Sequence, residues 1–165
     1  MIKIFIIHMN DDDPKKCTAK KMERFSLAKI LEPKSRPRGI VLTPYSDVIL
    51  SKEDLPYALI HGLYAVDISW KHAKEYFENV NGRKRRLPFL VPGNPVNFGH
   101  PGQLSTAEAI SAALYIMGEK DMALKIMEKF GWGHTFIEMN RELLEEYSRL
   151  DRKGIEALDE SMQHF

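Results

Sequence analysis

The chain has 165 residues, of which 44% are hydrophobic and 28% are charged. This length suits one domain or two small halves, and the composition is that of a globular protein, not a disordered one. No apolar run approaches the roughly 20 residues that cross a bilayer, and the first residues lack a signal-peptide cleavage pattern. A single cysteine excludes an internal disulfide, so we expect a cytoplasmic protein.

The net charge of +1 conceals an uneven distribution along the chain. Residues 1–99 hold 17 Lys and Arg against 11 Asp and Glu, a net charge of +6. Residues 100–165 hold 7 against 12, a net charge of −5. The basic half can face a polyanion such as a nucleic acid, although uneven surface charge is also common in proteins that bind none.

The first half of the chain contains short apolar runs and segments with a helical pattern. The apolar runs are continuous, which favours strands buried on both faces, as in a parallel sheet. Ser51 with Asp54 forms a capping-box pair, and Ser69 is placed to cap a second helix. In chain order, the expected elements are strands at 3–9, 28–33 and 39–44, a short helix or turn at 51–62, a strand at 62–70, a helix at 69–80 and a strand within 86–95.

From Ser105 onward nearly every residue fits a helical period. Ser105 with Glu108 caps the first of these helices, and Gly118 ends it. The sequence therefore predicts an α/β fold with a parallel-sheet N-terminal half and an all-helical C-terminal half, divided near Val91. The expected helices span 105–118, 119–133, 134–150 and 154–165.

The stretch "DDDPKKCTAKK" (11–21) follows the first expected strand. Consecutive aspartates do not have the alternate spacing of a calcium loop, and a lone Cys17 supports neither zinc nor dithiol chemistry. Cys17 is either a nucleophile activated by the nearby lysines or a buried bystander. We expect no metal site, and interpret the stretch as a loop at the carboxyl end of the sheet, where open α/β proteins bind ligands.

Two further segments carry candidate binding groups. In "VDISW" (66–70), Asp67 and Trp70 suit a cationic ligand through charge pairing and cation–π attraction, or form a helix cap and a packed ring. In "FLVPGNPVNFGHPGQLSTAEA" (89–109), prolines and glycines stiffen a loop that can present main-chain groups to adenine and a helix N-terminus to a carboxylate. The alternative for this loop is a linker between the two halves.

The run "NGRKRR" (81–86) holds four consecutive basic residues, which we expect to be solvated. It is either a phosphate-contacting loop or an ordinary exposed loop.

Three segments, in this order, resemble the signature segments of the small-subunit (16S/18S) rRNA aminocarboxypropyltransferases. They are "DPKKCTAKK" (13–21), "VDISW" (66–70) and "NPVNFGHPGQLSTAEA" (94–109). Ile68 stands where the family usually has cysteine, and Ala19 stands where it has glycine. Neither change removes a group to which we assign chemistry, although alanine leaves that loop less free to adopt a positive φ.

The resemblance implies a SPOUT-like fold with a deep trefoil knot, whose knotted segment would be residues 92–104. It implies an α/β RNA- and cofactor-binding domain at 1–91, and a knotted loop with a helical C-terminal domain at 92–165. The implied activity is transfer of the 3-amino-3-carboxypropyl group from S-adenosylmethionine to N3 of a uridine, such as N1-methylpseudouridine, in small-subunit rRNA during ribosome biogenesis. Methylthioadenosine would leave, with no metal involved.

The resemblance also implies the cofactor contacts. Asp67 would meet the donor's ammonium and be the base nearest to the uracil N3, while Trp70 would pack against the transferred chain. Main-chain amides at Thr18 and near Thr106 would hold the carboxylate. The whole expected set is Thr18, Leu42, Asp67, Trp70, Leu90, Leu104, Ser105 and Thr106, with Leu42 and Leu90 at strand ends enclosing adenine.

Basic residues of the first half are expected to meet the phosphates of small-subunit rRNA or of a pre-ribosomal subunit. We expect a monomer without membrane contact. Two alternatives stay open: a SPOUT-like RNA methyltransferase, and a non-enzymatic assembly factor that binds rRNA. The expected RNA-binding residues are Lys15, Lys16, Lys20, Lys21, Arg24, Lys71, Arg83, Lys84, Arg85 and Arg86.

Overall fold

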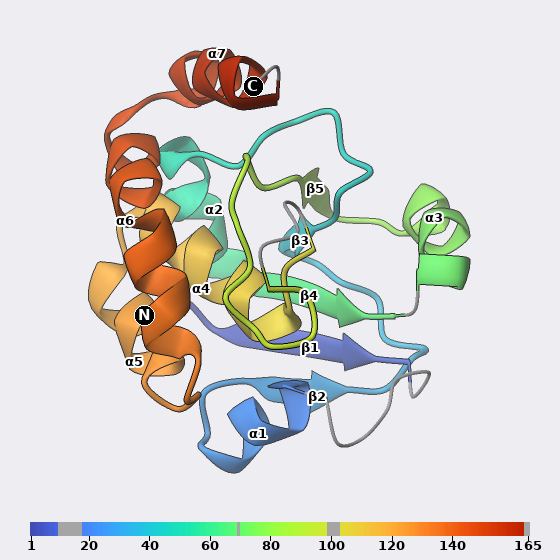
Figure 1. Ribbon diagram of the computed structural model, residues 1–165. Coiled ribbons are helices and arrows are strands. Elements are labelled where there is room, and N and C mark those ends of the chain that lie inside the picture. Colours follow the sequence, from blue (N-terminus) through green and yellow to red (C-terminus); the bar gives the residue numbers. More distant parts are fainter. Residues whose placement is uncertain (10–17, 69, 99–102, 164–165) are drawn as a thin grey trace. The chain divides into compact units, whose positions relative to one another are not determined.

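The computed structural model describes residues 1–9, 18–68, 70–98 and 103–163, and describes Trp70 by its backbone alone (Figure 1). The chain forms two compact units. The first comprises Met1–Val48 and Pro56–Arg86, and the second comprises Ile49–Leu55 and Leu87–Phe165. Within the described ranges, no helix has both the length and the apolar character needed to cross a membrane.

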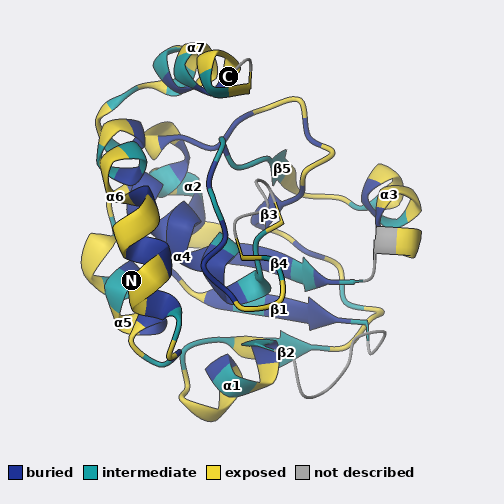
Figure 2. Cartoon of the chain, viewed as in Figure 1, coloured by how far each residue is buried: buried dark blue, intermediate teal, exposed yellow. Residues whose placement is uncertain are grey.

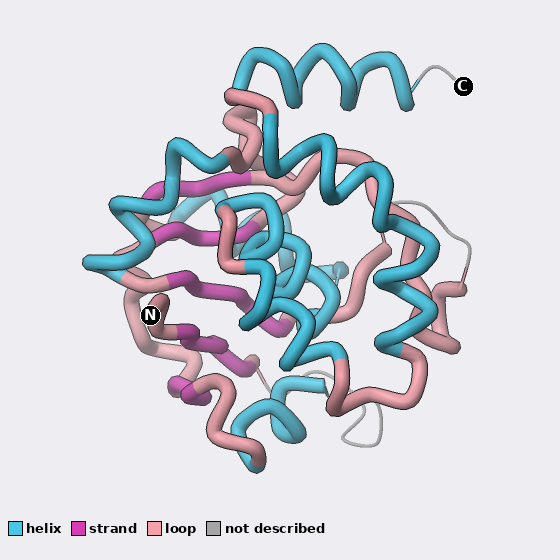
Figure 3. Tube along the Cα trace, turned by 90° about the vertical axis from the view of Figure 1, so that its left-hand side faces the viewer, coloured by secondary structure: helices cyan, strands magenta, loops and turns pink. Residues whose placement is uncertain are grey.

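The first unit is built on a sheet of five strands, seen side by side in Figure 3. Their spatial order is β2-β1-β4-β3-β5, and all four neighbouring pairs are parallel. This arrangement confirms the predicted parallel α/β sheet. The strands are β1 (Ile4–His8), β2 (Lys29–Leu31), β3 (Ile40–Leu42), β4 (Leu63–Asp67) and β5 (Arg83–Arg85).

The central strands β1, β4 and β3 are buried almost throughout, as Figure 2 shows. On one face of the sheet, Val41 and Tyr64 form a core cluster with Ala73 and Phe77 of helix α3 (Trp70–Asn79). Burying one large apolar side chain contributes about 1.5–3 kcal/mol, so Phe77 anchors α3 to the sheet. The apolar residues of α3 recur at helical spacing, which is why this segment lies as an amphipathic helix on the sheet.

Two short helices complete the first unit, α1 (Thr18–Arg24) and α2 (Leu55–His61), whose first residue belongs to the second unit. Gly62 ends α2 with a φ of +90° and leads directly into β4. Beside it, a Cβ on Gly39 would lie 2.2 Å from the Gly62 carbonyl oxygen. Only glycine lets these two segments of the chain approach so closely.

The fifth strand differs from the prediction. No strand forms within 86–95; the edge strand is instead β5, which pairs with β3. Prolines in 86–95 lack the N–H that a sheet ladder requires. The "NGRKRR" run is therefore not a solvated loop, because Lys84 Nζ donates to the Phe77 carbonyl and Arg83 lies 3.7 Å from the Tyr57 ring centroid.

The stretch 11–21 also differs in part. Residues 10–17, including Cys17, lie outside the described residues, but Thr18–Arg24 form helix α1 and not a loop. Ala19 is fully buried in that helix and has no positive φ. The methyl group of Ala19 therefore causes no backbone strain, because the helix does not require the positive φ that we had considered for a loop.

The second unit is helical, as predicted. Helix α4 is its core element, because ten of its residues are buried, and it packs against α5 and α6. Ser105 and Glu108 form the predicted capping box, and Gly118 ends α4 in the left-handed conformation. The elements are η2 (Lys52–Asp54), α4 (Thr106–Met117), α5 (Lys120–Met127), α6 (Gly133–Arg149) and α7 (Arg152–Gln163).

Helix α5 ends six residues before the predicted 133. A Cβ on Gly133 would lie 2.0 Å from the Met127 carbonyl oxygen, so the chain turns tightly between α5 and α6. The unit also carries the predicted Ser51–Asp54 capping box, which starts η2. Arg152 joins α7 to this turn by donating to the Asp54 carboxylate at 2.8 Å.

Candidate active site

In the first unit, Asp67 and His8 lie at the carboxyl ends of the adjacent strands β4 and β1. The two residues are register partners, and His8 Nε2 is 3.6 Å from an Asp67 carboxylate oxygen. Both side chains are about nine-tenths buried. A buried carboxylate requires a partner that offsets its lost hydration, and the imidazole supplies one here.

His8 was missed by the sequence reasoning. It ends one predicted strand as Asp67 ends another, but only the strand order brings these two ends together. Once β1 and β4 are taken as parallel neighbours, equal positions at their carboxyl ends become adjacent. The signal was therefore present in the pattern, but it depended on the sheet order.

The other predicted residues of the first unit lie at the starts and ends of its elements. Leu42 ends β3 and is 7% exposed. Thr18 begins α1 and is partly buried. Trp70 is the first residue of α3, and the Ser69 that was expected to cap this helix lies outside the described residues. The ends of parallel strands are where ligands bind in open α/β sheets.

In the second unit, side chains of α6 and α7 hold the main chain around Leu90. The Phe89 N–H donates to Asp159 at 2.7 Å, and its carbonyl accepts from the Tyr147 hydroxyl at 2.9 Å. Burial, and then the Asp159 charge, raise the pKa of Tyr147 above its usual range, so this hydroxyl stays a donor. Side-chain hydrogen bonds thus replace the sheet ladder that was predicted here.

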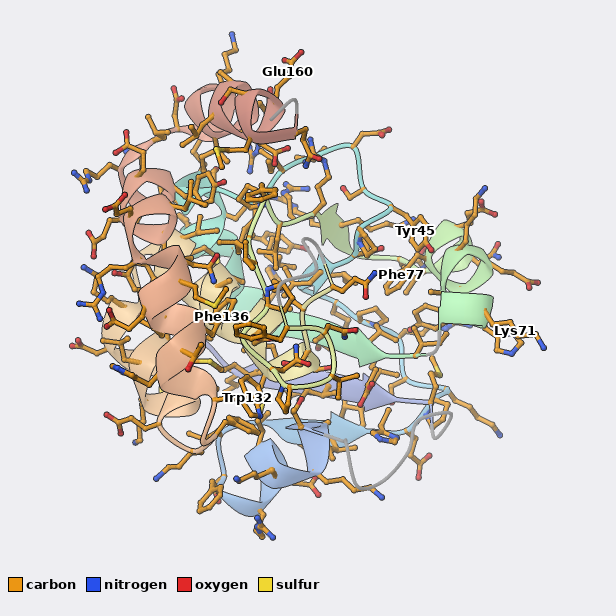
Figure 4. The ribbon with its side chains drawn as sticks, in the orientation of Figure 1. Tyr45, Lys71, Phe77, Trp132, Phe136 and Glu160 are labelled. Atoms are coloured by element: carbon orange, nitrogen blue, oxygen red, sulfur yellow. The ribbon has the colours of Figure 1, made fainter. Side chains whose placement is uncertain are left out.

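Asn140 of α6 makes the same kind of contact two residues further along, at Val91. Its Oδ1 accepts from the Val91 N–H at 2.8 Å, and its Nδ2 donates to the Val91 carbonyl at 2.7 Å. Nδ2 also donates to the carbonyl of Phe136, the α6 residue labelled in Figure 4. Asn140 is fully buried, so its amide has no water to replace these partners.

Leu90 lies between these two fixed residues and is 1% exposed. Within the part of the chain that the structure describes, its main-chain N–H and carbonyl make no hydrogen bond. Buried main-chain groups are normally paired, so this donor and acceptor are available to a ligand. Leu90 was predicted at the end of a strand, which is wrong; its neighbours Phe89 and Val91 are bonded to side chains of α6 and α7 and not to a strand.

Glu108 of α4 organises the next part of the loop. Its carboxylate accepts from the Gly93 and Asn94 main-chain N–H groups at 2.7 and 3.2 Å, and from the Asn94 side chain at 2.6 Å. It also accepts from the Ser105 N–H at 2.9 Å as part of the capping box. The sequence reasoning had assigned Glu108 to the cap alone, and had missed its hold on the loop.

The remaining cofactor candidates of the second unit surround the start of α4. Ser105 is the N-cap, Thr106 is the first helical residue, and Leu104 precedes them; all three are partly buried. The helix dipole makes this end of α4 favourable for an anionic group. Residues 99–102 of the same loop lie outside the described residues.

The expected RNA-binding residues of the first unit fall on different elements. Lys20, Lys21 and Arg24 lie on α1, and Lys71 points outward from α3 in Figure 4. Lys15 and Lys16 lie outside the described residues. The other four belong to β5 and to the residue that follows it: Arg83, Lys84, Arg85 and Arg86.

The first unit is an α/β unit with a candidate ligand site at the carboxyl end of its parallel sheet, and the second is a helical unit whose loop is held by side-chain hydrogen bonds. A family model described as "Ribosome biogenesis protein, C-terminal" matches residues 40–162. The structure of the SAM-dependent rRNA:acp-transferase Tsr3 from Vulcanisaeta distributa matches with a TM-score of 0.85. The identity to it is 34%, over 99% of each chain.

Curated relatives agree with this match. The 16S rRNA aminocarboxypropyltransferase of Methanosarcina mazei is 48% identical over 89% of this chain and 86% of its own length. The protein of the same name from Thermoplasma volcanium is 43% identical over 98% of both chains. This chain belongs to the 16S rRNA aminocarboxypropyltransferase family.

A second family model, described as a possible Fer4-like domain in RNase L inhibitor, matches residues 2–35. Iron–sulfur clusters of that kind are held by four cysteine thiolates. The whole chain has one cysteine, so its residues do not fit such a cluster.

Proposed function

We propose that this protein transfers the 3-amino-3-carboxypropyl group of S-adenosylmethionine to N3 of a uridine in small-subunit rRNA. Membership of the family supports the activity, and the observation that carries the site is the buried Asp67 carboxylate at the end of β4. The N3 nitrogen forms the new bond to the terminal side-chain carbon, the carbon–sulfur bond breaks toward sulfur, and the N3 proton is lost. S-adenosylmethionine supplies the sulfonium, which leaves as methylthioadenosine.

One structural observation supports the fit between this chain and S-adenosylmethionine. The main chain of Leu90 is buried and without hydrogen bonds among the described residues, while both neighbours are held by α6 and α7. Adenine offers a donor and an acceptor on one edge, which match a main-chain carbonyl and N–H. The apolar side chain of Leu90 provides the surroundings that a purine ring prefers.

Asp67 is the proposed partner of the donor's ammonium. A charge-assisted hydrogen bond from a buried ammonium to a carboxylate is about twice as strong as a neutral one. Holding the ammonium fixes the carboxypropyl chain, and therefore which of the three carbons on sulfur faces the RNA. Trp70 would pack against the same chain, and the main chains of Thr18, Leu104, Ser105 and Thr106 would hold its carboxylate and the ribose.

His8 is a positioning residue in this scheme, because it acts on Asp67 and not on the substrate. Its imidazole lies 3.6 Å from the carboxylate and restricts the direction in which Asp67 points. Asp67 is also the proposed acceptor of the N3 proton, although positioning alone can lower a barrier by about 7–11 kcal/mol. An Asp67→Ala variant that keeps near-normal turnover at saturating donor would contradict the base role.

Three broader features belong to the same proposal. The fold would be SPOUT-like, with the loop at 92–104 threaded through a deep trefoil knot, and residues 1–91 and 92–165 as functional domains. The protein would act as a cytoplasmic monomer. Its basic residues on α1, α3 and β5 would contact phosphates of the rRNA.

The experiment that tests this function uses two batches of S-adenosylmethionine, one labelled in the methyl group and one in the carboxyl group. Each is incubated with the protein and with unmodified small-subunit rRNA transcripts or rRNA that already carries N1-methylpseudouridine. We expect only the carboxyl label to enter RNA. Methyl label in the RNA would favour the methyltransferase alternative, and binding of RNA without either label would favour the assembly factor.

A further inference from the structure

A groove of about 600 Å³ opens between the loop that follows β2 and one face of α3, entirely within the first unit. It is lined by the loop residues Lys34 and Arg36 and by the α3 residues His72, Tyr76 and Asn79. These α3 residues differ from Ala73 and Phe77, which the same helix packs on the sheet. Tyr76 has both roles, because it lines the groove and also packs against this core cluster, with its ring centroid 5.2 Å from that of Phe77.

We propose that this groove binds one unpaired nucleotide of the RNA substrate, next to the uridine that is modified. The inference rests on the proposed function, because that function supplies the RNA. Ile68 lines the groove and follows Asp67 directly in the chain. A nucleotide held here would thus lie beside the carboxyl end of β4, which carries the proposed donor site.

The charge of the groove suits a phosphate. Lys34 and Arg36 are both exposed, and Glu75 is the one carboxylate among the lining residues that the structure describes. Pro33 and Pro37 bracket the two cations, and the Ser35 N–H donates to the Glu32 carbonyl at 2.9 Å. Because prolines and this turn stiffen the loop, little conformational entropy is lost when the cations meet a phosphate.

The chemistry of the α3 face suits a base. Tyr76 and His72 offer aromatic rings, and stacking on such rings is how proteins hold unpaired bases. The Tyr76 hydroxyl is buried and, within the described part of the chain, has no hydrogen-bond partner. Burial raises the pKa of Tyr76, so the hydroxyl keeps its proton and remains a donor. A bound base or ribose would supply the missing acceptor.

The proposal is tested with a fluorescein-labelled 12-nucleotide oligouridylate that carries one 4-thiouridine, and with the full chain. We expect Lys34→Ala/Arg36→Ala to weaken binding about 10-fold at low salt and to reduce the salt slope by about 0.7, the contribution of one single-strand phosphate contact. Lys125→Ala/Lys153→Ala is the matched control, because both lysines are exposed and lie in the second unit. We expect the control to bind like the parent protein.

Two further measurements locate the bound nucleotide. Tyr76→Phe should weaken binding about 2- to 10-fold without lowering thermal stability, because the hydroxyl has no partner in the folded chain to lose. Photocrosslinks from the 4-thiouridine should map to peptides that contain residues 33–37 or 68–81. Equal binding by the Lys34/Arg36 variant and its control, unchanged binding by Tyr76→Phe, or crosslinks only outside these peptides would each overturn the proposal.

The result is separable from the fate of the proposed function. The groove is tested by RNA binding and crosslinking without S-adenosylmethionine, while transfer is tested by label incorporation. If the protein binds the oligouridylate through the groove but transfers nothing, only the proposed function fails. If it transfers the group but the groove variants bind normally, only the groove proposal fails.

Discussion

At the scale of single residues, the key feature of the site is a carboxylate that is buried beside an imidazole. Asp67 is 9% exposed and lies at the carboxyl end of β4, where a ligand can reach the strand end. A buried aspartate of this kind costs free energy unless it is paired. The pairing with His8, and the proposed pairing with an ammonium, explain why the fold keeps a charge at this position.

Asp67→Asn keeps the shape of the side chain but removes its charge. We expect the dissociation constant for S-adenosylmethionine, measured by calorimetry, to rise about 10- to 100-fold, because hydrogen bonds to charged groups contribute about 1.5–3 kcal/mol. Asp47→Asn, an exposed aspartate of the same unit, is the control. Equal affinities for the two variants would remove Asp67 from the site.

The role of His8 is measured by a double-mutant cycle with Asp67. We expect His8→Gln to weaken donor binding less than Asp67→Asn does, and to have almost no effect once Asp67 is changed. The coupling free energy between the two positions should be about 0.5–3 kcal/mol, as found for residues that are in contact. Additive effects would show that His8 does not act through Asp67.

At the scale of elements, the important feature is a main-chain segment held by side chains. Among the described residues, the Phe89–Asn94 segment has no sheet partner, yet side chains of the second unit bind its N–H and carbonyl groups. These side chains are Asp159, Tyr147, Asn140 and Glu108. Such a segment is a rigid platform because its buried partners cannot be exchanged for water. It is also vulnerable, since removing one partner leaves several main-chain groups unpaired.

Glu108→Gln tests this platform. The amide cannot accept from all the donors that the carboxylate now serves, and it loses the charge that strengthens those bonds. We expect the free energy of unfolding to fall by about 2–4 kcal/mol in urea titrations. Glu142→Gln, at an exposed position of α6, should change it by less than about 0.5 kcal/mol.

Tyr147 gives the platform a dependence on pH. Its folded-state pKa is raised, so its contribution to stability is present below the unfolded value of about 10 and is lost as the pH rises above it. Tyr147→Phe should lower stability at pH 7 by about 0.5–1.5 kcal/mol and should flatten the decline above pH 10. An unchanged decline in the variant, followed by urea unfolding across that range, would contradict the assignment.

The elements also show what sequence reasoning can reach. Continuous apolar runs identified β1, β3 and β4, and the capping box of α4 was visible as Ser105 with Glu108, because both patterns are local. The edge strand β5 was missed, because its three basic residues resemble a solvated run. In the structure the Lys84 ammonium donates to a main-chain carbonyl and the Arg83 guanidinium lies over the Tyr57 ring.

The site was predictable only in part for a related reason. Asp67 could be placed at a strand end from its local pattern, but the His8 contact depends on which strands are neighbours. The hydrogen bonds from Asn140 and Asp159 to residues around position 90 join positions 49 and 70 residues apart. No local pattern in the sequence marks contacts of that range.

At the scale of the whole molecule, we expect an enzyme that uses RNA and S-adenosylmethionine without a metal. The chain has a single cysteine, and among its described residues no three His, Cys, Asp or Glu side chains are grouped as metal ligands. We therefore expect turnover to be unchanged after dialysis against EDTA. A loss of turnover that added metal restores would contradict this prediction.

The charge distribution makes a second prediction at this scale. The excess of basic residues before position 100 should make RNA binding weaken steeply as salt is raised, while donor binding changes little. Affinities for both ligands, measured between about 50 and 200 mM salt, test this difference. Equal salt dependence of both affinities would argue against phosphate contacts by the basic half.

The by-product of the reaction distinguishes aminocarboxypropyl transfer from methyl transfer most directly. The protein is incubated with S-adenosylmethionine, with and without small-subunit rRNA, and the small molecules are separated and identified by mass spectrometry. The account predicts methylthioadenosine, formed in step with RNA modification and only when RNA is present. S-adenosylhomocysteine in its place would identify a methyl transfer and would contradict the account.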